Sequence, residues 1–143
     1  MFRGLSSARL DEKGRLSMPT RFRDAFAQID NSFTLTRHPH GCLMIFAPDH
    51  WAKFSAQLES VPLESQWMKR FFYGFSCELS LDKAGRVTLP SELREPAQMP
   101  VNAELLIMGM GNTIEIWERG LYAANEAKAL AAAGGSASQI PAF

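Results

Sequence analysis

Two charged pairs of the same kind occur in the sequence, and each joins an aspartate to the arginine four residues later, with a glycine just before the arginine. The first is Asp11 with Gly14 and Arg15, and the second is Asp82 with Gly85 and Arg86. A carboxylate at this spacing can accept backbone N–H groups of a turn or hold the guanidinium by hydrogen bonds. An arginine held in this way is suited to bind a phosphate or the O6 and N7 atoms of guanine. The two pairs therefore predict contacts to nucleic acid.

A purely structural role is the alternative, since an exposed Asp–Arg pair contributes less than about 1 kcal/mol. A turn needs a glycine that can take positive φ, and often an aspartate, but it does not need an arginine after the glycine. Both charges are present in both copies, whereas Lys83 stands at the position of Glu12 and Ala84 at that of Lys13. Retention of the charged pair amid these differences favours a functional role.

The pairs belong to an internal repeat with an offset of 71 residues. Residues 10–19 (LDEKGRLSMP) align with residues 81–90 (LDKAGRVTLP), and residues 43–46 align with residues 114–117 at the same offset. Arg23 and Arg94 also match. A register that holds without a gap over separate segments predicts two copies of one unit. We expect the first copy and its helices at residues 1–71, and the second copy with a C-terminal helix and tail at residues 72–143.

Each copy is expected to place its charged turn between two short strands, followed by a helix and a hairpin. Alternating or apolar patterns and turn residues predict these strands and hairpins, with Thr20 as the N-cap of the first helix. The second copy has a shorter helix from Ser91, because Pro96 ends it early. The expected strands are 5–10, 15–18, 33–37, 42–46, 78–81, 86–89, 105–108 and 113–117, and the later helices are 49–58, 65–73 and 121–133. The fold class is therefore mainly β with helices, α+β.

Composition sets outer limits on the function. The chain has 143 residues, of which 46% are apolar and 21% charged, as in ordinary globular proteins. It has no apolar run of about 18 residues and no signal-peptide pattern at Met1, so we expect a cytoplasmic protein without a membrane span. Cys42 and Cys77 are expected to be free thiols. The net charge is zero, but residues 1–23 hold six basic side chains and only two acidic ones, so a basic face can still form.

The chain resembles the MraZ family over nearly its full length. The resemblance rests on the opening residues 1–4 (MFRG), the two repeated blocks and the segment 114–117 (IEIW). Either block alone would indicate only the wider AbrB and MazE class. The resemblance implies two tandem AbrB/MazE-like swapped-hairpin β-barrel modules that form an intramolecular pseudo-dimer.

The resemblance also implies a function. Members of the family look like transcription factors, and we expect a sequence-specific repressor that binds double-stranded DNA with repeated boxes at the promoter of its own division and cell-wall gene cluster. A ring-like homo-oligomer associated with the nucleoid is expected. The DNA-binding residues carried over are Arg15 and Arg86, with Lys13, Arg3 and Lys83 beside them, and the turn-supporting residues are Asp11, Gly14, Asp82 and Gly85. Because Ala84 replaces the lysine of the first turn, the second copy is expected to bind DNA more weakly.

Three alternatives are less favoured. An antitoxin-like module would bind a partner protein through an extended acidic C-terminal tail, but residues 134–143 are short and uncharged, and residues 136–143 are expected to be disordered. His38, His40 and Cys42 could suggest a metal site, but their spacing does not fit zinc rules, and we expect no metal or cofactor. No nucleophile–base, phosphate-loop or metalloprotease motif is present, so no enzyme activity is expected.

Aromatic residues at 67–75 are expected to pack between the two copies, with part available to a subunit interface.

Overall fold

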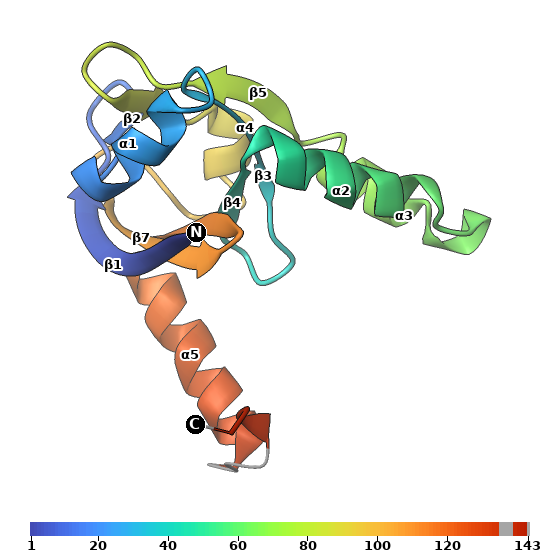
Figure 1. The fold of residues 1–143 in the computed structure, drawn as a ribbon. Coiled ribbons are helices and arrows are strands. Elements are labelled where there is room, and N and C mark those ends of the chain that lie inside the picture. Colours follow the sequence, from blue (N-terminus) through green and yellow to red (C-terminus); the bar gives the residue numbers. More distant parts are fainter. Residues whose placement is uncertain (135–138, 143) are drawn as a thin grey trace.

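The computed structural model describes residues 1–134 and 139–142. Strands and helices follow the same order in both halves of the chain (Figure 1). The first half contains β1 (Phe2–Arg9), β2 (Arg15–Ser17), α1 (Thr20–Ala27), β3 (Ser32–Arg37), β4 (Leu43–Phe46), α2 (Pro48–Glu59), the 3-10 turn η1 (Leu63–Ser65) and α3 (Trp67–Phe72). The second half contains β5 (Cys77–Ser80), β6 (Arg86–Thr88), α4 (Ser91–Arg94), β7 (Glu104–Gly111), β8 (Thr113–Glu118) and α5 (Arg119–Ala133). Of the tail expected to be disordered, residues 136–138 and 143 lie outside the described residues.

The two halves are interlocked through their strands. One antiparallel sheet has the order β1-β7-β8-β4-β3-β5, and a separate two-stranded ribbon pairs β2 with β6. Within these sheets, β1 pairs with β7, β3 with β5, β4 with β8 and β2 with β6. Each of these four ladders joins a strand of the first half to a strand of the second half. The structure is therefore mixed α and β with a mostly antiparallel sheet, and neither half makes its sheet alone.

The register of two ladders shows how the sequence repeat appears in space. In the ribbon, Leu16 lies opposite Val87, and in the large sheet Met44 lies opposite Glu115. Each of these residues faces its own counterpart 71 positions along the chain, which is what a two-fold axis through both ladders produces. The two-fold relation does not extend to the edges of the large sheet. The ladders β1–β7 and β3–β5 occupy equivalent positions in the repeat, but their registers differ by one residue.

The expected closed barrel is not found. The strands β1 and β5 are the edges of the large sheet, and no ladder joins them among the residues that the structure describes. Their continuation into β2 and β6 is short, because a turn precedes each of these three-residue strands and Pro19 or Pro90 follows it closely. The two short strands pair with each other as a separate ribbon instead of extending the large sheet.

The main core lies between the ribbon, α1, α4 and the large sheet. Leu16 and Val87 point into it and are 0% and 1% exposed, and burial of such side chains stabilises a fold by about 1.5–3 kcal/mol each. Because side chains alternate along a strand, burial of these two residues turns their neighbours Arg15 and Arg86 outward. Other members of this cluster come from both halves: Leu10, Phe26, Phe33, Leu35, Ile45, Leu89, Leu105, Ile107, Ile114 and Ile116.

The helices begin and end for local reasons. The prediction that Thr20 caps α1 is wrong: Pro19 holds the N-cap position without a side-chain bond, and its carbonyl accepts the backbone N–H groups of Phe22 and Arg23. The helix α4 has four residues, as Pro96 predicted. The helix α5 begins after Glu118, whose carboxylate accepts backbone N–H groups from the first turn.

None of the helices in the described part of the chain is long and apolar enough to cross a bilayer.

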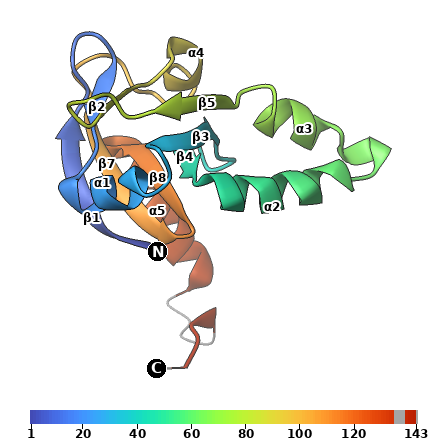
Figure 2. The same ribbon diagram turned by 45° about the horizontal axis from the view of Figure 1, so that its top comes forward.

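A second cluster holds α2 and α3 against the first hairpin. Phe72 and Leu58 pack with Met44 and Phe46 of β4, and the two helices extend away from the sheet (Figures 1 and 2). The aromatic residues of α3 therefore pack within the first half, and the prediction that they lie between the copies is wrong for them. The side chain of Trp67 is 49% exposed.

Candidate nucleic-acid interface

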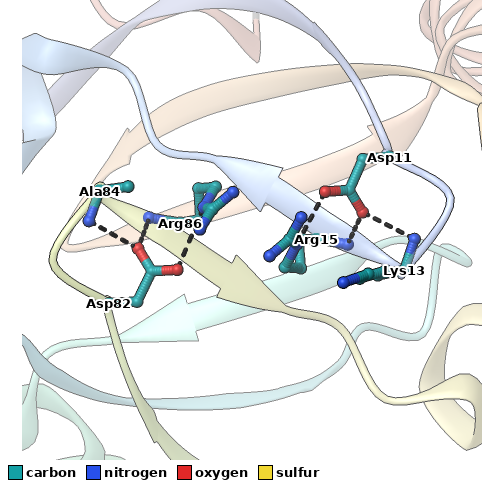
Figure 3. Close-up of polar contacts among 6 residues, drawn as sticks. All are labelled: Asp11, Lys13, Arg15, Asp82, Ala84 and Arg86. Atoms are coloured by element: carbon teal, nitrogen blue, oxygen red, sulfur yellow. Dashed lines mark hydrogen bonds and ion pairs between the residues drawn. The ribbon is translucent and has the colours of Figure 1, made fainter.

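The first charged turn is held by the carboxylate of Asp11. Its Oδ1 accepts the backbone N–H groups of Lys13 at 2.9 Å and Arg15 at 2.8 Å, and its Oδ2 accepts the Nε–H of Arg15 at 2.8 Å (Figure 3). One oxygen therefore shapes the backbone, while the other orients the guanidinium. The sequence predicted that this aspartate could accept backbone N–H groups of the turn or hold the guanidinium, and in this turn it does both.

The second turn repeats this geometry. Oδ1 of Asp82 accepts the backbone N–H groups of Ala84 and Arg86, both at 2.9 Å, and Oδ2 accepts Nε–H of Arg86 at 3.1 Å (Figure 3). The N–H group of Lys13 in the first turn has its counterpart in that of Ala84, because this bond uses the backbone and not the side chain. Replacement of the lysine by alanine therefore leaves the frame of the turn unchanged.

A glycine is required in each turn. Gly14 has φ 76° and Gly85 has φ 77°, a left-handed conformation that side chains with a Cβ rarely adopt. The N–H group of each glycine is bonded to the carbonyl of the aspartate that starts its turn, at 3.1 Å for Asp11 and 2.9 Å for Asp82. This bond closes the turn and fixes where the following arginine begins.

The aspartates remain ionised under ordinary conditions. The pKa of Asp11 lies below its usual value of 3.8, first because it accepts the backbone N–H of Arg15 and further because of its bond to the Arg15 side chain. The pKa of Asp82 is lowered in the same way by Arg86. Each carboxylate thus partly neutralises and firmly orients its arginine.

The ribbon places the two arginines on one surface. Arg15 lies opposite Thr88 and Arg86 lies opposite Ser17, so the arginines are diagonal neighbours on the outer face, a relation that spans roughly 7–8 Å between backbones. Their side chains are 28% and 35% exposed. Each guanidinium donates its Nε–H to the aspartate of its turn, and its terminal NH2 groups donate no hydrogen bond to residues 1–134 and 139–142. Those groups are free to bind an acceptor outside the protein.

Each turn is also held by the other half of the chain. The backbone N–H of Met18 donates to the carbonyl of Gly85 at 2.9 Å, and that of Leu89 donates to the carbonyl of Gly14 at 2.8 Å. These bonds extend the ribbon at both ends and tie the two turns into one rigid unit.

Two further arginines contribute to the turns. Arg23 donates from Nε to the carbonyl of Met18 at 2.8 Å, and a Cβ on Gly85 would lie 2.5 Å from that Nε. Arg94 makes the corresponding bond to Leu89 and lies against Gly14. The sequence showed this pair only as a match at the 71-residue offset and gave it no role.

The other predicted DNA-binding residues occupy different positions. The side chains of Lys13 and Lys83 are exposed within their turns. Arg3 is exposed on β1 opposite Met110, six residues before the end of the strand that leads to the first turn. At about 3.4 Å per residue it lies about 20 Å from that end. The structure therefore does not bring Arg3 together with the paired turns.

Histidine and cysteine side chains near the first hairpin lie close to Glu115 of the second half. The candidate ligand atoms of His38, Cys42 and Glu115 lie within 4.8 Å of one another. However, Nδ1 of His38 accepts the backbone N–H of His40 at 3.0 Å, which puts the ring proton on Nε2, 3.6 Å from the Glu115 carboxylate. Burial raises the pKa of the Cys42 thiol far above its usual value. In this tautomer Nε2 of His38 carries the ring proton and has no free lone pair to offer a metal, and the absence of a metal remains a prediction.

Two arginine-bearing turns related by a two-fold axis match the symmetry with which two-fold regulators bind paired half-sites on DNA. Comparison with known proteins agrees with this class. The family described as "MraZ protein, putative antitoxin-like" matches the chain twice, at residues 1–71 and 72–138.

Curated relatives are similar over most of the chain. Proteins named transcriptional regulator MraZ are 46% identical over 131 residues in Delftia acidovorans, covering 91% of each chain, and 47% identical over 133 residues in an Acidovorax species, covering 92% of each chain. A third, from a Polaromonas species, is 47% identical over 129 residues, covering 90% of this chain and 89% of the relative. The chain belongs to the MraZ family of transcriptional regulators.

Proposed function

We propose that this regulator binds double-stranded DNA in a sequence-specific manner through the outer face of the β2–β6 ribbon. The observation that carries the proposal is the pair Arg15 and Arg86, each held by an aspartate through Nε and each with terminal NH2 groups that make no hydrogen bond to the described part of the chain. A two-stranded ribbon fits the major groove of B-DNA, where paired N–H donors of an arginine match guanine O6 and N7. The function proposed is one of binding and not of catalysis.

The neighbouring residues assist in different ways. Asp11 and Asp82, with Gly14 and Gly85, fix the turns, so little rotamer freedom is lost when DNA binds. Lys13 and Lys83 are exposed beside the arginines and are assigned to phosphates. Such contacts add affinity without base preference. Arg3 lies away from the ribbon, so any contact that it makes to DNA would be outside the stretch bound by Arg15 and Arg86.

The proposed architecture is an intramolecular pseudo-dimer of two swapped-hairpin modules, residues 1–71 and 72–143. Support comes from the pairing of β2 with β6 and of β4 with β8 about equivalent residues. Such a unit offers one arginine from each module to the same stretch of DNA.

The biological setting follows from the family resemblance. We propose a cytoplasmic, nucleoid-associated repressor that binds repeated boxes at the promoter of its own division and cell-wall gene cluster. A ring-like homo-oligomer would raise avidity by placing several ribbons on successive boxes. The half-exposed Trp67 and the exposed Leu63 at the tip of the α2–α3 hairpin are consistent with subunit contacts.

The test is fluorescence anisotropy with a duplex from upstream of this gene and an unrelated duplex of equal length. The wild-type protein should prefer the first duplex, and its affinity should fall steeply between ~50 and ~200 mM salt. Arg15→Ala should raise Kd for the first duplex by roughly tenfold or more. Arg15→Lys should retain binding to the unrelated duplex but lose preference, because lysine keeps the charge and not the paired donors.

A protein-binding role is the second candidate, and the observation that favours it is the antitoxin likeness in the family's description. A folded wild-type protein that binds neither duplex would point to this role. If circular dichroism shows that Arg15→Ala is unfolded, the role of Arg15 in its turn is structural instead.

A further inference from the structure

A groove runs beside the ribbon in the first half of the chain. It lies between β1, β2 and the start of α1 and is lined by polar and basic residues that include Ser6, Arg9, Ser17, Thr20, Arg21 and Arg23. Among the residues that the structure describes, none of those lining the groove is acidic. The elements β1, β2 and α1 lie together at one end of the molecule, on the opposite side from α3 (Figures 1 and 2).

The groove of the first half adjoins the arginine of the second half. Ser17, which lines the groove, is the cross-strand partner of Arg86 on the outer face of the ribbon. Arg23, also in the lining, lies against Gly85, the residue just before Arg86. Because strands β2 and β6 are antiparallel, the basic surface near Arg86 comes from a segment about 70 residues away in sequence.

The equivalent surface beside Arg15 has the opposite charge character. At the 71-residue offset, Arg21 corresponds to Glu92, Arg9 to Ser80 and Ser7 to Glu78. Arg94, the counterpart of Arg23, is the one basic residue kept. The groove side therefore carries three arginines, whereas the equivalent positions on the other side carry two glutamates and one arginine, although the ribbon between the two sides is two-fold symmetric.

Arg21 is the side chain best placed to bind a ligand in the groove. It is exposed, donates one of its N–H groups from Nη2 to Ser6 Oγ at 2.5 Å, and lies 5.2 Å from the centre of the Phe22 ring. These contacts steer the guanidinium but occupy one of its five N–H donors. By contrast, Arg9 is paired with Glu104 at 2.7 Å and with the carbonyl of Asn102.

We infer that this groove binds the sugar–phosphate backbone of DNA next to the base pairs contacted by Arg86, and that its counterpart next to Arg15 does not. The inference rests on the proposed function of the ribbon. Arginine, serine and threonine groups are common phosphate ligands, whereas Glu92 and Glu78 would repel the same backbone. The pseudo-dimer consequently has a preferred orientation on DNA, with the first half anchored to phosphates beyond the ribbon.

This arrangement also alters the expected ranking of the two copies. The sequence predicted weaker binding by the second copy because Ala84 replaces a lysine. In space, Arg86 is accompanied by Lys83 and by the basic groove, so we expect Arg86 to contribute at least as much to affinity as Arg15 does.

The inference is tested by anisotropy with the duplex from upstream of this gene, using Arg21→Ala and the reciprocal Glu92→Arg. Arg21→Ala should weaken binding several-fold on specific and unrelated duplexes alike. If one phosphate contact is lost, the fall in affinity between ~50 and ~200 mM salt should shrink by about threefold. Glu92→Arg should tighten binding and steepen the salt dependence.

Arg70→Ala is the matched control, since Arg70 is exposed on α3 away from the ribbon, and it should bind as wild type. If Arg15→Ala loses binding while Arg21→Ala and Glu92→Arg both match the wild type, the groove is not a phosphate site and the inference is overturned. If Arg15→Ala itself binds normally, the proposed function fails. Should Arg21→Ala not fold, Glu92→Arg alone decides: unchanged affinity and salt dependence would overturn the inference.

Discussion

At the scale of single residues, each aspartate of the paired turns serves the backbone and the arginine at once. In the first turn, Oδ1 of Asp11 accepts two backbone N–H groups and Oδ2 accepts Nε–H of Arg15. Bonds from N–H donors favour the ionised carboxylate and lower its pKa. The shape of the turn and the aim of its arginine therefore depend on the same charge.

This linkage predicts acid sensitivity that belongs to the turns. The folded-state pKa values of Asp11 and Asp82 lie below the ordinary 3.8, so both carboxylates add stability above that pH. The contribution is lost as the pH falls through the lowered folded values. Urea unfolding from pH 7 down to about pH 3 should show a smaller loss of stability in the double variant Asp11→Asn/Asp82→Asn than in the wild type. Parallel losses in both proteins would show that the turns do not carry this sensitivity.

At the scale of elements, the turns are coupled across the ribbon. Arg23 of the first half lies against Gly85, and Arg94 of the second half lies against Gly14. A Cβ on Gly85 would lie 2.5 Å from Arg23 Nε, which is bonded to Met18, whereas a Cβ on Gly14 would lie 3.3 Å from Arg94 Nε. The same substitution therefore meets different resistance in the two turns.

We expect Gly85→Ala to destabilise the protein more than Gly14→Ala. Both variants place a Cβ at positive φ, which costs about 1–2 kcal/mol, and Gly85→Ala must also displace Arg23 from the Met18 carbonyl. Chemical denaturation of the two variants measures the difference directly. Equal destabilisation would mean that Arg23 moves freely and does not brace the second turn.

Local elements could be predicted from the sequence because their causes are local. The repeated turns, the break at Pro96 and the hairpins follow from residues that are near in the chain, and the structure has them close to the expected positions. The partners of the strands could not be predicted in this way, since pairing of β1 with β7 or β2 with β6 depends on packing between halves. The same is true of Glu115 beside His38, and of the basic groove beside Arg86.

At the scale of the whole molecule, the chain behaves as two copies that complete each other. Four ladders join strands from different halves, and the main core takes side chains from both. A half by itself would leave the edges of its strands and much of its apolar surface exposed. Because Leu16 and Met44 each face their own counterparts in the second half, we expect the first half to be able to pair with a second copy of itself.

The isolated fragment 1–71 should therefore have no folded monomer. We expect it to be unfolded at low concentration and to fold as a homodimer at high concentration, with a thermal midpoint that rises with concentration. Circular dichroism melts at several concentrations, together with sedimentation velocity, measure this. A folded monomeric fragment would contradict the interlocked arrangement.

The central claim is that Arg15 and Arg86 together form the DNA-binding element. The most direct measurement is the Kd of the double variant Arg15→Ala/Arg86→Ala for the duplex from upstream of this gene, at ~50 mM salt where phosphate contacts are strongest. The variant must first show wild-type circular dichroism and assembly. We predict that specific binding is lost while Arg70→Ala retains it. A double variant that is folded and binds this duplex with wild-type affinity would contradict the account.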